Sequence, residues 1–381
     1  MMTRPSVLLI GGSGIIGRYI ERAANDQGYD VTSVSRRGAR PGARFRTEHI
    51  AADFRRVDAL ADLTGNRTFD ATIDLLSFGP EQAERTMRLV AGVGGQYIFV
   101  SSATIYEASS GDSPIQEEHP RVVAGWSYPL AKIAAEDAVR RGAAEENIDF
   151  TIVRPYITYS EQRLPFGPWE AEQVMHRLAS ERPVAVGSSV ESRLTALTHS
   201  EDVGRAIVAL IGNESAINED FHIATPQSVT WGDLYRIVAD GLGVRLRMID
   251  VPTSGIKSTF AELGGKISDR DRQRRFDSAK LQSAIPGFEF RHSVESGVPG
   301  IARSLRDLPR STGAMFEGRW NRMLALGSLS EAREDARENV PPTLVERAKY
   351  LVGRSEVAFS VARRLKEFRQ GRSSDDYGTS G

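Results

Sequence analysis

Residues 7–17 have the sequence VLLIGGSGIIG, an apolar segment that runs directly into a glycine-rich loop. Four consecutive apolar residues predict a strand buried on both faces, as in a parallel sheet. Gly11, Gly14 and Gly17 then follow with the spacing GxxGxxG, a close relative of the dinucleotide-binding GxGxxG loop. In such loops the glycines permit a tight turn, the approach of a pyrophosphate and the packing of helix on strand. The stretch therefore predicts a dinucleotide site at a helix N-terminus, where the N–H groups and the helix dipole favour negative charge.

The end of the second predicted strand, at Val31–Ser35, bears on the choice of cofactor. A site for NAD places an acidic residue there to bind the ribose hydroxyls, whereas the 2′-phosphate of NADP requires a cation. Here Ser35 is followed by Arg36 and Arg37, and planar guanidinium groups suit a phosphate. The alternative is that both arginines are solvated surface residues. We expect NADP as the preferred cofactor, with NAD as the alternative.

Strands and helices alternate along the first 150 residues. Helices are expected at 18–28 and 81–91, and further strands at His49–Asp53, Phe69–Leu76 and Gln96–Ser102. This alternation predicts an α/β fold with a Rossmann-type, doubly wound parallel sheet. Because ligands of such sheets lie beyond the carboxyl ends of the strands, Asp53 is expected to reach the adenine amino group.

Tyr128 and Lys132 lie four residues apart in a predicted helix, and therefore on one face of it. A phenol titrates at about pH 10, too high for a general base at neutral pH, but a neighbouring ammonium stabilises the phenolate and lowers the pKa. A hydroxyl such as that of Ser102 can bind the substrate oxygen through a hydrogen bond. The three residues predict a proton-transfer site for alcohol oxidation or ketone reduction. The alternative is an amphipathic helix that pairs a half-buried ring with an exposed lysine.

Taken together, these segments resemble the extended short-chain dehydrogenase/reductase superfamily, which includes nucleotide-sugar epimerases and dehydratases. Six segments carry the resemblance in chain order, namely GGSGIIG at 11–17, SSATIY at 101–106, YPLAK at 128–132, RPYITY at 154–159, THSEDV at 198–203 and FDSAK at 276–280. They are similar to the family patterns GGxGxxG, SSxxVYG, YxxxK, RPxxVYG, VHVxDVA and DxxK. The resemblance covers roughly residues 5–300.

The resemblance implies roles for individual residues. Ser102 is then the catalytic hydroxyl and Tyr128 the acid/base, while Lys132 also holds the nicotinamide ribose. The residues expected at the cofactor are Gly11, Gly14, Ile15, Ile16, Gly17, Ser35, Arg36, Arg37, Asp53, Phe54, Leu75, Lys132 and Pro155. The residues expected near the substrate are Thr104, Tyr156, Tyr159 and Arg193.

The chain also departs from the family pattern. Members that act on sugar nucleotides usually carry an arginine seven residues before the aspartate of VHVxD. Counting back from Asp202 gives Thr195, and Arg193 lies two residues away from that position. The sequence DLLS at 74–77 replaces the usual HLAA. These departures resemble a divergent branch that contains chloroplast RNA-binding relatives and uncharacterised reductases, and they leave the substrate unassigned.

The sequence pattern suggests three parts. Residues 1–153 are expected to form the NAD(P)-binding Rossmann domain, with segments near 195–212 returning to it, and residues 154–304 mainly a smaller α/β substrate lobe. Within that lobe we expect a strand at Phe221–Ala224 and helices at 169–180, 202–211 and 231–242, the last capped by Thr230. Residues 305–381 are expected to form a basic helical extension with a disordered tail.

The extension is expected to contain a helix at 319–336 and one or two helices at 344–370. Residues 347–372 contain eight lysines and arginines against two acids, as a basic amphipathic helix does. Its apolar residues are expected to pack against the body of the protein or a second subunit. Contact with nucleic acid or a membrane surface is the less favoured alternative. A homodimer is the expected assembly.

Composition narrows the remaining possibilities. The chain of 381 residues has a formal net charge of −1, so no overall field attracts nucleic acid or a membrane. It contains no cysteine, which excludes disulfides, thiolate zinc sites and thiol nucleophiles. None of the six histidines pairs with another ligand at metal spacing, so no metal is expected. Without a leader or an apolar run of about 18 residues, we expect a cytoplasmic protein.

The sequence therefore predicts an NAD(P)-dependent oxidoreductase or epimerase. It would act at a secondary alcohol or ketone of a sugar-like small molecule, whether nucleotide-linked or not. The alternative is a cofactor-binding or RNA-binding scaffold that keeps the fold without the chemistry. The presence of Ser102, Tyr128 and Lys132 argues against that alternative, because a binding module does not need this set.

Overall fold

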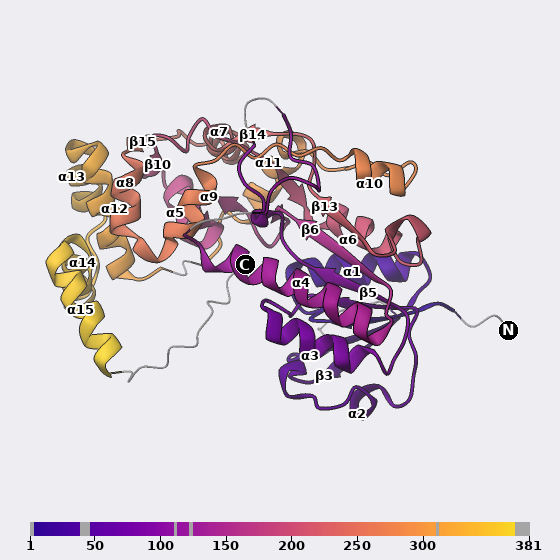
Figure 1. Cartoon of the computed structure of the whole chain (residues 1–381). Helices are drawn as coiled ribbons and strands as arrows, with labels where there is room; N and C mark the ends of the chain where they lie inside the picture. The colour runs from indigo at the N-terminus through magenta and orange to yellow at the C-terminus, as the bar shows by residue number, and fades with distance from the viewer. Residues whose placement is uncertain (1–3, 39–45, 110–112, 122–124, 310–311, 370–381) are drawn as a thin grey trace.

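The computed structural model describes residues 4–38, 46–109, 113–121, 125–309 and 312–369. Figure 1 shows two lobes side by side, with the C-terminal helices at the end of the second lobe that lies away from the main sheet. The tail expected beyond residue 370 lies outside the described residues.

The main sheet contains seven strands in the order β13-β6-β5-β4-β1-β2-β3, and all neighbouring strands are parallel. The strands are β1 (Ser6–Ile10), β2 (Asp30–Ser35), β3 (Thr47–Ala51), β4 (Ala71–Asp74), β5 (Gln96–Val100), β6 (Phe150–Pro155) and β13 (Glu219–Ile223). The order reverses between β1 and β4, and open sheets of this kind bind ligands at such a reversal. The predicted doubly wound parallel sheet is confirmed.

Helices cover both faces of this sheet. They are α1 (Ile15–Asp26), α2 (Ala61–Thr64), α3 (Pro80–Val90), α4 (Ser127–Glu146), α6 (Ser200–Ala209) and α10 (Ala279–Ala284). Val7 and Leu9 of β1 are buried in the core that contains residues of α1 and α6. Leu8 and Ile10 are buried in the opposite core, with residues of α3 and α4. Because both faces of β1 are covered, its sequence is continuously apolar rather than alternating.

The strand expected in the second lobe at Phe221–Ala224 belongs to the main sheet instead. Its counterpart β13 pairs with β6, with Phe221 opposite Val153. The return of the chain to the first lobe therefore includes a seventh strand beyond the expected segments near 195–212. A short apolar strand has the same local pattern in either lobe, so the sequence did not reveal its pairing partner.

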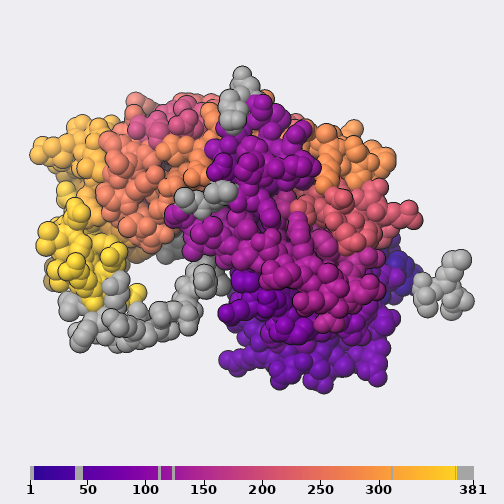
Figure 2. Space-filling model, in the orientation of Figure 1, coloured from indigo at the N-terminus to yellow at the C-terminus, as the bar shows by residue number. Residues whose placement is uncertain are grey.

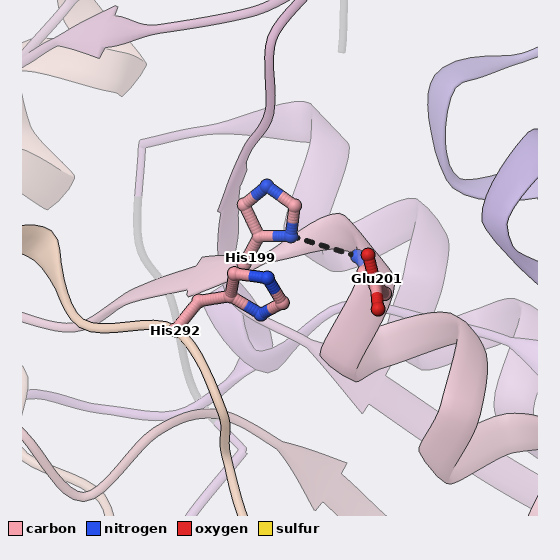
Figure 3. A group of neighbouring side chains, drawn as sticks. All are labelled: His199, Glu201 and His292. Carbon is pink, nitrogen blue, oxygen red and sulfur yellow. Dashed lines mark hydrogen bonds between the residues drawn. The ribbon is translucent and has the colours of Figure 1, made fainter. Parts of the chain in front are cut away.

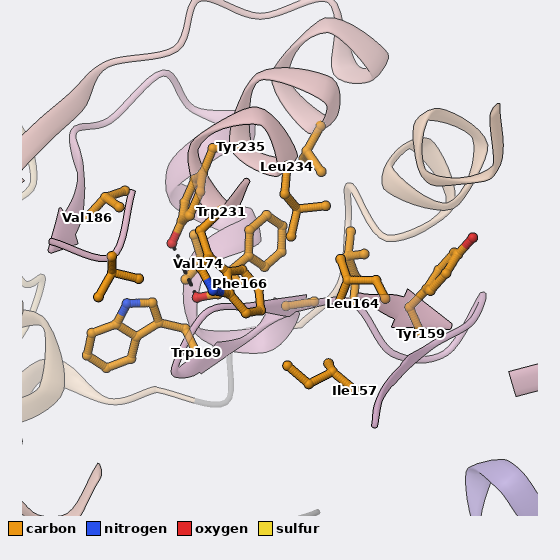
Figure 4. Packing of buried hydrophobic residues seen from close by; sticks show 14 of the residues in the cluster. Ile157, Tyr159, Leu164, Phe166, Trp169, Val174, Val186, Trp231, Leu234 and Tyr235 are labelled. Carbon is orange, nitrogen blue, oxygen red and sulfur yellow. Dashed lines mark hydrogen bonds between the residues drawn. The ribbon is translucent and has the colours of Figure 1, made fainter. Parts of the chain in front are cut away.

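The second lobe consists of short strands and helices around an aromatic core. Its strands are β7 (Ile157–Tyr159), β8 (Pro165–Phe166), β9 (Trp169–Glu170), β10 (Val184–Gly187), β11 (Leu194–Thr195), β12 (Leu197–His199), β14 (Val229–Thr230) and β15 (Met248–Val251). Its helices are α5 (Ala171–Ala179), α7 (Trp231–Leu242), α8 (Thr253–Thr259), α9 (Gly264–Arg270) and α11 (Val294–Ser304). Trp169, Trp231 and Tyr235 lie at the centre of this core (Figure 4).

Two helices of this lobe test the sequence predictions. The helix α7 has the predicted bounds, and Thr230 caps it by accepting a hydrogen bond from the Asp233 backbone N–H at 3.0 Å. The helix expected at 169–180 begins at Ala171 instead, because Trp169 and Glu170 pair with the preceding strand β8.

Four helices form the C-terminal extension, namely α12 (Ala314–Gly327), α13 (Leu329–Glu338), α14 (Leu344–Arg354) and α15 (Glu356–Arg369). The single helix expected at 319–336 is therefore wrong. The chain breaks at Ser328, whose hydroxyl caps α13 by accepting from the Glu331 backbone N–H at 3.3 Å. The basic segment likewise divides at Ser355 into α14 and α15. No helix in the described ranges is long and apolar enough to cross a membrane.

Glycines bring α12 and α14 into backbone contact. A Cβ added at Gly318 would lie 2.0 Å from the carbonyl oxygen of Tyr350, and one added at Gly353 would lie 2.1 Å from that of Met315. Real Cβ atoms do not approach other atoms so closely, so the two helices pack at a distance that only glycine permits.

A buried ion network joins α5 to α12 and α13. The Arg177 guanidinium donates to Glu317 at 2.7 Å and to Asp335 at 2.8 Å. Arg182 donates to the same two carboxylates at 2.9 and 2.8 Å. Despite burial, hydrogen bonding from His176 and the charges of the two arginines lower the pKa of Glu317 to about 2. Two cations and two anions therefore compensate one another inside this contact.

Candidate active site

The glycine loop forms a sharp turn between β1 and α1. Gly11 has a φ of 91°, a left-handed conformation that favours glycine, and its N–H donates to Val34 at 2.9 Å. The Gly14 N–H donates to the Gly11 carbonyl at 3.2 Å, and α1 begins at the next residue. Among the described residues, no side chain caps this helix and none in its first turn is acidic. The N-terminus of α1 is therefore suited to an anion.

The glycines of this loop differ in the space that their neighbours leave for a side chain. A Cβ at Gly17 would lie 2.7 Å from the backbone of Gly12, so the chain itself requires glycine at position 17. A Cβ at the exposed Gly14 would lie 3.6 Å from the Gly11 carbonyl oxygen, the nearest described atom beyond the two adjacent residues. The chain thus leaves space at Gly14 that its own packing does not need. This space fits a pyrophosphate that approaches the backbone.

The carboxyl ends of the main strands bring the predicted cofactor residues into one row. Neighbouring strands lie about 4.8 Å apart, so the row from β3 through β2, β1 and β4 to β5 offers a continuous edge to an elongated ligand. Ser35 ends β2 and is buried, whereas Arg36 and Arg37 are exposed. Ile15 and Ile16 open α1 and are half-buried. Pro155 is buried at the end of β6.

The segment after β3 holds its acidic residue through a local ion pair. Arg55 donates to the two carboxylate oxygens of Asp53, each at 3.0 Å. These hydrogen bonds hold the pKa of Asp53 below its usual range, and the charge of Arg36 acts in the same direction. Asp53 is therefore a carboxylate at the predicted adenine end. The ring of Phe54, predicted at the cofactor, is buried in the core, and its carbonyl accepts a hydrogen bond from Arg85 at 3.1 Å.

The DLLS sequence after β4 has a structural explanation. The buried Asp74 carboxylate accepts hydrogen bonds from the Leu76 N–H at 2.7 Å, the Ser77 N–H at 3.2 Å and the Tyr97 hydroxyl at 2.7 Å. This turn places Leu75 and Leu76 directly against Gly11, because a Cβ on that glycine would meet Leu76 at 2.9 Å and Leu75 at 3.2 Å. Two leucines thus form the wall that smaller residues form in the family pattern.

The predicted catalytic hydroxyls lie together. The Ser102 hydroxyl lies 3.0 Å from that of Thr104, and it accepts from the Thr104 backbone N–H at 3.3 Å. Tyr128 is the second residue of α4, and the Ser102 hydroxyl is close enough to lower the pKa of its phenol. Burial raises the pKa of the Tyr128 phenol, while the hydrogen bond from Ser102 and the charge of Arg163 act against this rise. Ser102, Thr104 and Tyr128 therefore form one polar cluster beyond the end of β5.

Lys132 lies one helical turn beyond Tyr128 and is fully enclosed. Its ammonium donates to the backbone carbonyls of Ser77 and Val100, both at 2.9 Å, which places it between the ends of β4 and β5. It lies 4.7 and 4.9 Å from the ring centres of Phe78 and Phe99. Burial lowers the pKa of Lys132 to about 8, against the opposing effects of the Asp74 and Glu136 charges. Lys132 is thus a buried cation at the centre of the row, without an ion-pair partner among the described carboxylates.

Arg163 is a site residue that the sequence reasoning missed. It donates to the two carboxylate oxygens of Glu170 at 3.1 and 3.0 Å, and to Thr158 at 3.3 Å. Lys266 lies 3.6 Å from the same carboxylate. The charge of Arg163, in the second lobe, lowers the pKa of the Tyr128 phenol, and the same role for Lys132 stays a prediction. No local motif marks this arginine, because its position depends on the packing of the two lobes.

The residues predicted near the substrate are distributed differently. Tyr156 is buried, and its hydroxyl donates to Asp269 at 3.0 Å. Tyr159 is fully buried and donates to the Ser293 carbonyl at 3.1 Å. The side chain of Arg193 is 37% exposed and lies 3.5 Å from Asp271. Thr104 alone of the four contacts the Ser102 and Tyr128 cluster.

Two histidines distant in sequence form a joint at the start of α6 (Figure 3). The rings of His199 and His292 stack with centres 4.0 Å apart. His199 caps α6 by accepting from the Glu201 N–H at 3.2 Å, and Nδ1 of His292 lies 3.1 Å from the Asp202 carboxylate. Side-chain atoms of His199, Glu201 and His292 lie within 4.8 Å of one another, a proximity that sequence spacing did not predict. His199 thus has a structural role at the start of α6.

A parallel sheet with a glycine loop after its first strand, and a serine and tyrosine at its carboxyl edge, defines an NAD(P)-dependent enzyme of the extended short-chain dehydrogenase/reductase type. Residues 7–224 match the sequence model of the NAD dependent epimerase/dehydratase family, and the chain belongs to that family. Its cofactor is NAD or NADP.

Similar proteins of known activity include several reductases. The 2'-dehydrokanamycin reductase of Streptomyces kanamyceticus is 27% identical over 301 residues, which cover 75% of this chain and 80% of that protein. Dihydroflavonol 4-reductase of Zea mays is 25% identical over 82% of this chain and 92% of its own length. The chloroplast stem-loop binding protein of 41 kDa b from Arabidopsis thaliana is 26% identical over 62% of this chain and 63% of its own length.

Solved structures have the same fold. Pal from Bacillus thuringiensis has a TM-score of 0.64 at 17% identity, covering 80% of this chain and 99% of its own. UDP-glucuronic acid 4-epimerase from Bacillus cereus, in complex with NAD, has a TM-score of 0.60 at 16% identity, covering 79% and 100%. RMD from Pseudomonas aeruginosa, complexed with NADPH, has a TM-score of 0.60 at 17% identity, covering 79% and 99%.

Proposed function

We propose that the chain moves a hydride at a secondary alcohol or ketone of a sugar-like small molecule, with Tyr128 as the acid/base. The observation that carries this proposal is the pair of Ser102 and Tyr128 at the carboxyl edge of the sheet, where the Ser102 hydroxyl lies 3.0 Å from that of Thr104 and lowers the pKa of the Tyr128 phenol. This pair and the glycine loop lie at the same edge of the sheet. Ligands of such sheets bind along this edge, so one elongated ligand is expected to contact both the pair and the loop. A binding module has no need of such a pair.

Bound NAD(P) supplies or accepts the hydride. In the direction of reduction, the Tyr128 hydroxyl donates a proton to the substrate oxygen, and the Ser102 hydroxyl donates a hydrogen bond to the same oxygen. The charge of Arg163 stabilises the phenolate that Tyr128 becomes. Lys132 lies where its ammonium can donate to ribose hydroxyls beside β4 and β5. In the direction of oxidation, the Tyr128 phenolate accepts the proton of the substrate hydroxyl, and Ser102 keeps its hydrogen bond to the same oxygen.

The relatives support the substrate class in part. One relative is named as a reductase of 2'-dehydrokanamycin, and the similar Bacillus cereus structure is that of a UDP-glucuronic acid 4-epimerase. Net reduction and epimerisation remain alternatives for this chain. Net reduction consumes NADPH in proportion to product, whereas epimerisation turns substrate over without net loss of the reduced cofactor. Absorbance of reduced nicotinamide, measured with keto sugars and with UDP-glucuronic acid, distinguishes them.

Replacing Tyr128 by phenylalanine tests the proposal. We expect Tyr128→Phe to lower the turnover rate by about 10²- to 10⁴-fold, the usual contribution of a general acid or base. NADPH affinity should stay within about twofold, because the cofactor edge is unchanged. Tyr235→Phe is the matched control, since this buried tyrosine lies in the second-lobe core, and it should retain activity. Full activity of Tyr128→Phe would refute the assigned role.

The preference for NADP is a second part of the proposal. Its support is that Arg36 and Arg37 are exposed directly after β2, on the cofactor edge, with no acid ending that strand. Arg36→Ala combined with Arg37→Ala should weaken NADPH binding at least about tenfold more than NADH binding, because charge-assisted contacts to the 2′-phosphate disappear. Fluorescence titration with both cofactors measures the difference. Equal losses would contradict the assignment.

A cofactor-binding or RNA-binding scaffold is the competing proposal. It is favoured by the similarity to the chloroplast stem-loop binding protein, although the match covers less than two thirds of that protein. It predicts that Tyr128→Phe leaves stem-loop RNA affinity unchanged and that no turnover is found with the keto sugars. Turnover lost selectively in Tyr128→Phe rejects this proposal.

A further inference from the structure

The C-terminal helices α14 and α15 form a projection on the side of the second lobe away from the main sheet (Figure 2). The helix α14 packs on α12 through Tyr350 and Gly353, which are both buried. Its opposite side and much of α15 face outward. This outward surface is a prominent feature that neither the fold nor the proposed chemistry explains.

Aliphatic side chains occupy the outward surface, and together they are called the aliphatic stripe here. Its members, with their exposed fractions, are Leu344 (82%), Val345 (64%), Leu351 (60%), Val357 (75%) and Val361 (52%). Leu344 and Leu351 lie two turns apart on one face of α14, and Val357 and Val361 lie one turn apart on α15. Scattered exposed apolar residues need no explanation, but aliphatic faces on two successive helices do.

Positive charges accompany the aliphatic stripe. Residues 344–366 contain six lysines and arginines but only two acids, in a chain whose formal net charge is −1. At 100° per residue, Arg347 and Lys349 lie on opposite flanks of the stripe on α14. One of the two acids, Glu346, is occupied in the capping box with Thr343, whose hydroxyl donates to it at 2.8 Å. On α14 the surface is therefore apolar along its middle and cationic at its edges, and on α15 Arg364 lies on the same face as Val357 and Val361.

A second copy of the chain does not fit this surface through a twofold contact. Such a contact places one patch against itself, so the cations beside each stripe would meet their own copies. The two acids of this segment are too few to offset six cations. Charge complementarity therefore requires an anionic partner.

Nucleic acid complements the positive charges of this surface but not its aliphatic side chains. Proteins bind single-stranded nucleic acid through aromatic side chains that stack on bases, alongside cations that contact phosphates. The stripe contains only leucine and valine, and the half-buried Phe359 ring is covered by the Arg319 guanidinium at 4.3 Å. Lipid offers both complements, acyl chains for the aliphatic side chains and anionic headgroups for the flanking cations.

We propose that the outward surface of α14 and α15 docks the enzyme on anionic lipid membranes, with the aliphatic stripe at the acyl boundary and the flanking cations among the headgroups. The helices lie along the interface and do not cross the bilayer. This inference is independent of the reaction proposed above, because no residue of the stripe belongs to the active site.

Co-sedimentation of the full chain with vesicles tests the inference. Vesicles of equal parts phosphatidylcholine and phosphatidylglycerol should bind the protein, and binding should weaken as salt is raised because headgroup attraction is screened. Vesicles of phosphatidylcholine alone should bind at least about tenfold more weakly, since several cations act together. Equal binding to both vesicles, or binding to neither, overturns the proposal.

Variants of exposed residues separate lipid docking from the other partners. Leu344→Ser combined with Leu351→Ser should weaken binding to the anionic vesicles at least about tenfold, since burial of one leucine is worth that much. Arg347→Gln, Lys349→Gln and Arg364→Gln together should remove most of the salt dependence, because these cations lie beside the aliphatic stripe. Leu130→Ser, on the 51% exposed leucine of α4, is the matched control and should bind like the parent.

Two further measurements exclude the competing partners. Size-exclusion chromatography without lipid should give the same oligomeric state for the parent and for the double leucine variant. A dimer that the leucine changes dissociate would assign the stripe to a second copy and overturn the lipid assignment. Polyuridylate binding that the three cation changes abolish, in a protein that ignores the vesicles, would overturn it in favour of nucleic acid.

Discussion

Two regions of the molecule use the same devices for different ends. At the turn between β1 and α1, Gly17 lets the helix approach the backbone of Gly12, and between α12 and α14 Gly318 and Gly353 allow a still closer approach. Each region also encloses a cation. Lys132 at the sheet edge donates to two neutral carbonyls, whereas Arg177 in the lobe contact meets two carboxylates.

The partners of the two buried cations indicate a structural role for Arg177 and a chemical role for Lys132. A buried charge whose partners neutralise it fixes the packing around it, while one held only by carbonyl dipoles has its pKa displaced, as groups at functional sites often do. The pKa of Lys132 is accordingly lowered to about 8. Around Arg177, in contrast, the carboxyl of Glu317 is held ionised down to a pKa of about 2.

Removing the compensated cation should have the largest effect. Arg177→Met leaves Glu317 and Asp335 buried with one cation fewer, and we expect the free energy of unfolding to fall by about 3–5 kcal/mol. Urea denaturation followed by circular dichroism measures it. Arg236→Met is the control, because this arginine is 51% exposed and its pairs with Asp233 and Glu191 are worth about 1 kcal/mol or less. Similar losses in both variants would contradict the comparison.

Substitution of Gly17, the glycine that the packing of the chain itself requires, should have the second largest effect. In Gly17→Ala the new methyl group meets the Gly12 backbone at 2.7 Å, so the helix must move off the strand, at a cost of about 1–3 kcal/mol. Gly264→Ala serves as the reference, because a Cβ there meets no atom within 4 Å and its φ is helical. The same denaturation experiment compares them, and an unchanged midpoint for Gly17→Ala would show that the loop relaxes freely.

Gly14 should respond in the opposite way. Gly14→Ala has room in the chain, so the unfolding midpoint should stay the same, whereas the affinity for NADPH should fall about tenfold or more as the methyl group occupies the pyrophosphate position. Fluorescence titration of NADPH provides the measurement. Gly92→Ala, another position with no atom within 4 Å, should change neither quantity. Unchanged affinity in Gly14→Ala would remove the pyrophosphate from this site.

The smallest expected effect is a pH dependence at Lys132. Its pKa of about 8 means that the ammonium loses its charge as the pH rises through 8, so NADPH affinity should be constant below pH 7 and decline above pH 8. Asp74 and Glu136 are the nearby acids that favour the charged form. Lys132→Met should bind more weakly and show no such step. A step of equal size in the variant would assign it to another group.

The sequence predicted what local backbone geometry encodes. The first strand, the glycine turn and the helix after it are specified by adjacent residues, and the tyrosine and lysine of α4 share a face because helical spacing requires it. The roles of Asp74 and Arg163 were not predicted. Asp74 acts through backbone N–H groups that any sequence possesses, and Arg163 reaches its place only when the lobes pack.

The same limit explains the errors in the rest of the chain. The strand β13 differs in no local way from a second-lobe strand, so only its pairing with β6 reveals where it belongs. Arg177 and Asp335 are 158 residues apart, and no periodicity links such distant charges. The break at Ser328 does have a local signal, because serine is a common N-cap and its hydroxyl accepts from the Glu331 backbone N–H. The prediction of one helix at 319–336 did not use this signal.

The place of β13 at the edge of the main sheet has a consequence for biosynthesis. A nascent chain that has emerged only as far as β6 holds six of the seven strands, with one flank of β6 still unpaired. The partner strand follows some 60 residues later, after much of the second lobe has been made. The nucleotide-binding half thus cannot close before its companion has begun to form. A ribosome that stalls within this interval exposes a strand edge to other chains.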